Sequence, residues 1–137
     1  MKKLLTLTLS LLAVVACFLI SGCDKSPITA DENTVFITAT DKSFDFTDKT
    51  VLNFMEYLKD KGEFDFEISD DGMVTSINGK ANTNNSYWML YTDDDENANE
   101  QWGTFEHEGK IYGSATAGVK TLKIKENCLY IWAYQTF

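Results

Sequence analysis

One segment of the chain has the spacing of an amphipathic helix, while most other patterned segments alternate as strands do. Apolar residues recur at helical intervals over residues 51–58. Gly62 stands where a C-cap would lie, and candidate N-caps precede the segment at Thr47, Asp48 and Thr50. A helix with one apolar face needs a surface to cover, and the neighbouring strands supply it. The sequence therefore predicts an α+β fold in which a sheet packs on one helix.

Alternation of apolar and polar residues predicts strands on both sides of this helix. The expected strands are 34–40, 44–46, 64–68, 73–77, 86–92, 110–112, 121–125 and 128–137, with a turn at 41–43 pairing the first two. Asn78-Gly79 is the strongest hairpin signal in the chain. Residues 93–103 are acidic, rich in Asn and unpatterned, so they predict a long surface loop.

Both faces of the last expected strand carry apolar or aromatic side chains. Such a strand lies inside a sheet and is covered on both sides. The helix covers one side, and a loop, a ligand or a partner would cover the other.

The first 23 residues have the pattern of an export signal that ends at a lipidation site. Lys2 and Lys3 precede an apolar run, and Cys23 follows Ser21-Gly22. A membrane-spanning helix is the alternative, because the run is near the lower length limit for one. No cationic stop-transfer cluster follows the run, which favours the lipoprotein.

The expected organisation is a signal peptide over 1–22, a lipidated tether over 23–33 and one domain over 34–137. Acylated Cys23 would insert into the bilayer and hold the domain on the extracytoplasmic face of the cell membrane. Cys17 would leave with the signal and Cys23 would carry lipid, so Cys128 has no partner for a disulfide.

Charge excludes several classes of partner. The net charge is −9, and all twelve basic residues are Lys. This balance argues against nucleic acid and disfavours electrostatic attachment of the chain to anionic lipid. Without Arg, bidentate clamps for phosphate or carboxylate groups are absent.

Four segments, taken in order, resemble the transcobalamin-like carboxy-terminal domain family: Thr50-Val51-Leu52, 74–79, 87–91 and 130–134. The resemblance spans about residues 35–137. It implies a β-grasp-like mixed sheet around one helix, related to soluble ligand-binding modules, with a corrinoid as a candidate ligand. The chain lacks the helical barrel that completes the corrinoid site in vertebrate carriers, and Glu126-Asn127 replaces the usual Gly-Asp turn.

Aromatic residues form the main candidate binding site. A shallow platform for a planar ring or a sugar could be lined by Trp88, Tyr91, Trp102, Phe105 and Tyr112, together with Trp132. In a domain this small, about two thirds of these rings are expected to be core. Trp102 has polar neighbours and is the ring expected to be exposed.

Catalytic and metal sites have little support. His107 is the only His, lies between two Glu residues and is expected on a solvated turn, so neither a zinc site nor a triad can be assembled. The protein is therefore not expected to be an enzyme. Residues 93–97 suggest calcium, but Ala98 and Thr104 occupy positions where an EF-hand needs Gly and Glu.

Two functions fit these features. The first is a membrane-anchored extracytoplasmic binding lipoprotein that takes a corrinoid or another small cyclic ligand and passes it to a transporter or partner domain. The second is a cell-surface module for protein interaction or glycan adhesion. A concave pocket near Trp88 and Trp102 would favour the first, and a flat, exposed aromatic patch would favour the second.

Overall fold

The computed structural model describes residues 25–137. The predicted signal peptide and the lipidation site at Cys23 lie outside the described residues. Within residues 25–137, no helix has the length and apolar character needed to cross a membrane.

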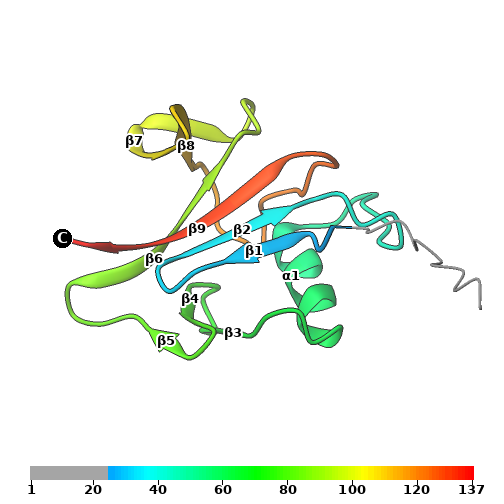
Figure 1. Cartoon of the computed structure of the whole chain (residues 1–137), viewed down its shortest axis with the longest axis horizontal. Helices are drawn as coiled ribbons and strands as arrows, with labels where there is room; N and C mark the ends of the chain where they lie inside the picture. The colour runs from blue at the N-terminus through cyan, green and yellow to red at the C-terminus, as the bar shows by residue number, and fades with distance from the viewer. Residues whose placement is uncertain (1–24) are drawn as a thin grey trace, which may run out of the picture.

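A six-stranded sheet forms the body of the domain (Figure 1). Its order is β1 (Ile28–Ala30), β2 (Thr34–Thr38), β9 (Leu129–Thr136), β6 (Ser86–Thr92), β8 (Lys110–Ala115) and β7 (Ala98–His107). A second sheet contains β3 (Phe66–Ile68), β4 (Val74–Ile77) and β5 (Lys80–Ala81), and the helix is α1 (Val51–Asp60). The α+β prediction is confirmed. All strand pairs among the described residues are antiparallel, so the mixed sheet implied by the resemblance is not found.

Helix α1 begins and ends where the sequence predicts. The Thr50 hydroxyl accepts a hydrogen bond from the backbone N–H of Asn53, and the Asn53 side chain accepts one from the N–H of Thr50. This capping box satisfies two donors that would otherwise lack partners in the first turn. Gly62 has φ 75°, the left-handed conformation that closes a helix.

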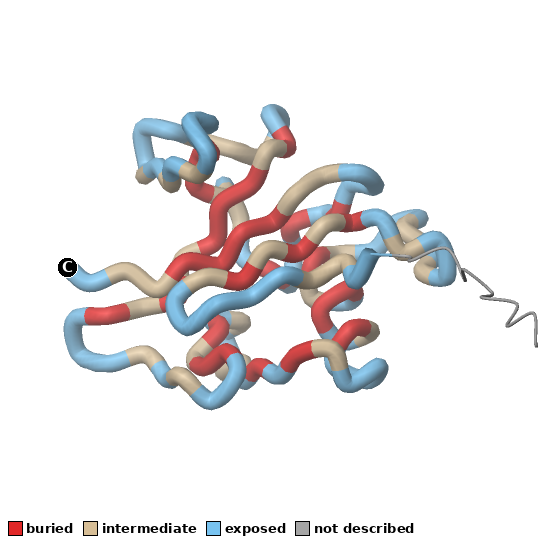
Figure 2. The backbone as a smooth tube through the Cα atoms, in the orientation of Figure 1, coloured by how far each residue is buried: buried red, intermediate tan, exposed pale blue. Residues whose placement is uncertain are grey.

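The main core lies between α1 and one face of the six-stranded sheet, called here the inner face. Phe54, Met55 and Leu58 on α1 are completely buried. The inner face supplies large side chains from three strands: Val35, Ile37, Trp88, Leu90, Tyr130 and Trp132. Figure 2 shows the buried stretches meeting along β9 and its neighbours. The side chains of β9 are buried on both faces, as expected for a central strand.

The hairpin of β7 and β8 covers the other face of the sheet, called here the outer face (Figure 1). Its cluster contains Tyr91, Tyr112, Ile131 and Ala133, with Phe36, Met89, Phe105 and Leu129 packed against them. The second face of the last strand, β9, is therefore covered by another part of the same chain.

Four expected elements differ from the structure. The fold starts earlier than expected, because β1 at Ile28–Ala30 pairs with β2. Most of the expected loop 93–103 is strand, since β7 begins at Ala98. Residues 44–46 are not a strand: Asp41 and Asp45 each accept a backbone hydrogen bond two residues on, which turns the chain. Residues 121–125 form only an isolated bridge, although Leu122 and Ile124 are buried.

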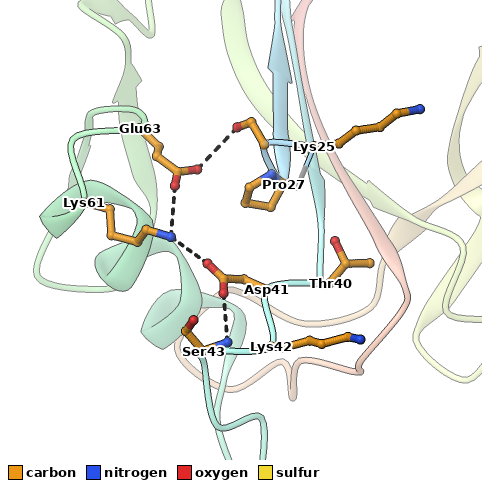
Figure 3. A pocket seen from close by; sticks show the side chains of 9 residues that line it. Lys25, Pro27, Thr40, Asp41, Lys42, Ser43, Lys61 and Glu63 are labelled. Atoms are coloured by element: carbon orange, nitrogen blue, oxygen red, sulfur yellow. Dashed lines mark hydrogen bonds and ion pairs between the residues drawn. The ribbon is translucent and has the colours of Figure 1, made fainter. Parts of the chain in front are cut away.

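An ionic network closes the end of the domain where residue 25 lies (Figure 3). Lys61 contacts Asp41 at 2.7 Å and Glu63 at 3.2 Å, and the Tyr57 hydroxyl donates to Asp41 at 3.0 Å. The hydrogen bond from Lys61 lowers the pKa of Asp41 from 3.8 to about 2. The folded state therefore favours the ionised carboxylate.

We expect Asp41→Asn to remove a pH-dependent part of the stability. A depressed folded pKa stabilises the protein above the unfolded pKa, and this contribution is lost as pH falls from about 4 to about 2. Because Lys61 is partly exposed, we expect a loss of about 1 kcal/mol at neutral pH. Urea unfolding from pH 2 to 7 measures it. Asp60→Asn is the control, because Asp60 makes no side-chain ion pair within residues 25–137.

Candidate binding surface on the β7–β8 hairpin

The β7–β8 hairpin is attached to the sheet at its base and packs over the outer face with its remaining length. Only two positions pair β8 with β6, Tyr91 with Ser114 and Thr92 with Gly113. Farther along, Phe105 lies 5.7 Å from Tyr91 and 6.4 Å from Phe36 between ring centres. Apolar packing therefore holds the hairpin over the sheet, because few strand hydrogen bonds do so.

His107 takes part in this packing. Its ring centre lies 4.6 Å from that of Phe36, and its side chain is partly buried. The solvated turn begins one residue later, at Glu108-Gly109, where both residues have positive φ. The imidazole lies 3.8 Å from the carboxylate of Glu108. Its ring packs against the rings of Phe36 and Phe105.

A bulge near the start of β7 places Trp102 on the surface. The register with β8 shifts between Asn99 and Thr104, so the residues between them have no paired partners. Gly103 has φ 151°, a conformation that other residues rarely adopt. Trp102 is 64% exposed and Ile111, on the paired strand, is 52% exposed. These are two of the four large exposed apolar side chains in residues 25–137.

A polar cavity of about 470 Å³ lies beside the bulge. Its lining includes Asp93, Asp95, Asn99, Gln101, Lys110 and Ile111. The Lys110 ammonium lies 3.8 Å from Asp93 and 5.0 Å from the ring centre of Tyr112. The cavity therefore combines amide, carboxylate and ammonium groups, which donate and accept hydrogen bonds.

The acidic loop after β6 is held by the chain's own donors. Asp94 is almost fully buried and accepts hydrogen bonds from the backbone N–H of Glu96 and the side-chain amide of Asn97. Asp93 accepts from the backbone N–H of Leu129 at 2.7 Å. In residues 25–137, no three side chains of His, Cys, Asp or Glu converge as metal ligands.

The six aromatic residues expected on one platform lie in three places. Trp88 and Trp132 belong to the inner core, where the indole N–H of Trp88 donates to the carbonyl of Lys80 at 2.8 Å. Tyr91, Phe105 and Tyr112 pack together under the hairpin. Trp102 alone is exposed, and four of the six are buried, as expected.

In residues 25–137, four surface cavities are each lined by at most one of the five predicted binding residues. Four residues that line the polar cavity are not among the binding residues predicted from the sequence: Asn99, Gln101, Lys110 and Ile111. The sequence of a polar edge strand shows no alternation of apolar and polar residues, so it cannot be told from the sequence of a loop.

Comparison of the chain with protein-family models, with curated proteins and with solved structures gives no match.

Gly113 controls the fit between β8 and the bulge. A Cβ at this position would lie 2.9 Å from the backbone nitrogen of Asn99 and 3.1 Å from the Cβ of Ala98. We expect Gly113→Ala to displace the start of β7 and destabilise the domain by about 1–3 kcal/mol. Hydrogen exchange of the β7 and β8 amides would be faster in this variant. Gly118→Ala is the control, because a Cβ there meets nothing within 4 Å. Equal exchange in both variants would contradict the prediction.

Proposed function

We propose that the protein is an extracytoplasmic lipoprotein, anchored through acylated Cys23, that acts as an adhesion module for a glycan. The observation that carries this proposal is Trp102, a large apolar side chain 64% exposed on a hairpin that packs on a folded sheet. The hairpin lies on the side of the sheet away from α1 and far from residue 25, where the described chain begins (Figure 1). An anchored domain would therefore present it outward.

The chemistry beside Trp102 suits a sugar. A pyranose ring has an apolar face of C–H groups that packs on an aromatic ring, and its hydroxyls need donors and acceptors. Asn99, Gln101 and Lys110 provide both, and they line the polar cavity beside the bulge, whose lining does not include Trp102 itself. No catalysis is proposed, because His107 packs against Phe36 and Phe105.

Binding of the purified chain to a panel of immobilised polysaccharides tests this proposal. We expect binding to at least one neutral or amino-sugar polysaccharide, with competition by its oligosaccharide fragment. If the chain binds no polysaccharide of the panel but binds a protein of the same envelope through the hairpin, the partner is a protein and the glycan proposal is wrong.

A small cyclic ligand, such as the corrinoid suggested by the resemblance to the transcobalamin-like family, is the second candidate. A cavity of about 410 Å³ supports it, because Trp88, Val35 and Ile77 form the apolar part of a lining that also contains Asp31, Glu32, Asn78 and Lys80. Titration with cyanocobalamin while tryptophan fluorescence is recorded tests this candidate. Binding in this cavity would quench the fluorescence in the native chain and in Trp102→Phe, and less in Trp88→Phe. Absence of quenching would exclude the corrinoid.

A further inference from the structure

Charge is distributed unevenly over the domain. Four segments meet where residue 25 lies, residues 25–27, 39–50, 61–63 and 123–127, and we call them the tether-end surface. Backbone hydrogen bonds join them: Thr38 donates to the carbonyl of Pro27, Asn127 to that of Ala39, and Ile124 to that of Lys49. Lys61 completes the surface through its ion pairs with Asp41 and Glu63.

The tether-end surface holds six of the ten lysines and five of the twenty acids in residues 25–137. The rest of the described domain therefore carries four lysines and fifteen acids. The overall negative charge is thus concentrated outside the tether-end surface, which is close to neutral when Asp94 and Glu96, the partners of Lys125 at 3.5 and 3.6 Å, are counted with it.

Four of the six lysines of this surface have no carboxylate partner, whereas Lys61 and Lys125 are paired. Five lysines form no ion pair with a carboxylate within residues 25–137: Lys25, Lys42, Lys49, Lys120 and Lys123. All but Lys120 lie on the tether-end surface. In Figure 3, Lys25 and Lys42 extend to the same side, away from the Lys61 network. Lys25 and Lys42 line a cavity of about 430 Å³. Ser26, Thr40 and Ser43 add hydroxyl groups to its lining.

We propose that the tether-end surface rests on anionic lipid headgroups, with Lys25, Lys42 and Lys49 facing the bilayer. The inference rests on the proposed acylation of Cys23, which lies two residues before Lys25 and hence within about 7 Å of it along the chain. Anionic headgroups attract these ammonium groups and repel the acidic remainder of the domain. Both forces turn the domain the same way, so the hairpin faces away from the membrane.

The test measures the acylation rate of each lysine in the full lipidated protein by a membrane-impermeant ester and mass spectrometry. The protein is placed in vesicles of phosphatidylcholine alone or mixed equally with phosphatidylglycerol. We expect Lys25, Lys42 and Lys49 to react at least about fivefold more slowly in the mixed vesicles, the factor for one lysine at an anionic surface. Lys80 and Lys110, outside the tether-end surface, should react equally in both. High salt should remove the difference.

A variant pair controls for net charge. Lys42→Gln with Lys49→Gln should abolish the slow reaction of Lys25, because the remaining surface no longer attracts the headgroups. Gln101→Glu with Thr104→Glu changes the net charge by the same amount as the lysine pair, at exposed positions on the hairpin. This variant should keep the slow reaction of Lys25.

Each contrary outcome has its own meaning. A chain that does not float with phosphatidylcholine vesicles overturns the anchor and this inference together. A chain that floats but reacts equally in both vesicles overturns the lipid contact alone. If inorganic phosphate without vesicles slows the same lysines equally, the surface binds a soluble phosphate group and the membrane contact is wrong.

Discussion

Replacing Phe54 by Ala is expected to destabilise the protein by about 3–5 kcal/mol. Phe54 is completely buried on α1, and its ring centre lies 4.9 Å from that of Phe44 and 5.3 Å from that of Phe46. Removing the ring leaves a cavity that these neighbours cannot fill without moving. Domains of this size have a total stability of about 5–15 kcal/mol, so the variant would be close to unfolding.

Urea unfolding followed by circular dichroism measures the effect of the Phe54 substitution. Glu56→Ala is the matched control, because Glu56 is exposed on the same helix and its loss should change the stability by less than about 0.5 kcal/mol. A loss below about 1.5 kcal/mol for Phe54→Ala would mean that the aromatic cluster does not depend on this ring.

Replacing Trp102 by Ala is expected to weaken binding of the proposed glycan by at least about 30-fold, as the loss of a central aromatic contact does. The stability should change little, because the side chain is exposed. Isothermal titration with the oligosaccharide found in the binding panel measures the affinity, and thermal unfolding measures the stability. Trp102→Tyr should retain part of the affinity, since an aromatic face remains.

Met73→Ala provides the control for this substitution. Met73 is 54% exposed and lies before β4, outside the hairpin. Its loss should leave the affinity unchanged. If Trp102→Ala binds normally, the site lies elsewhere; if both variants lose affinity equally, the binding is a general property of exposed apolar side chains.

Local signals were sufficient to predict several elements from the sequence. The α1 prediction is confirmed because Thr50 and Gly62 act through bonds and conformations of the adjacent turns. The bounds of β6 agree with the expected strand, and Asn78-Gly79 forms the expected turn with φ of 48° and 82°. Each of these features depends on residues close together in the chain.

The incorrect predictions involve partners distant in sequence. The polar start of β7 is a strand because β8 supplies its backbone partners beyond a bulge. The alternating residues Leu122 and Ile124 are buried, but their backbones bond to Val51 and Lys49 instead of a full strand. Alternation predicts which side chains are buried and does not predict whether a neighbouring strand is present.

The single aromatic platform could have been questioned from the sequence. Trp88 and Tyr91 are three positions apart in β6, and side chains in a strand alternate between faces. They must therefore point to opposite sides of the sheet. The position of Phe105 and Tyr112 over Tyr91 could not be predicted, because it depends on how the hairpin folds back.

Because only two positions pair β8 with β6, we expect the hairpin to open as a cooperative unit of its own. Breaking those pairs and the contacts under Phe105 would expose the outer face while leaving α1 and the inner core packed. Such a partial opening costs less free energy than global unfolding. Proteases would consequently cleave first within the opened hairpin, and aggregation would begin at Ile131 and the other apolar side chains of the outer face.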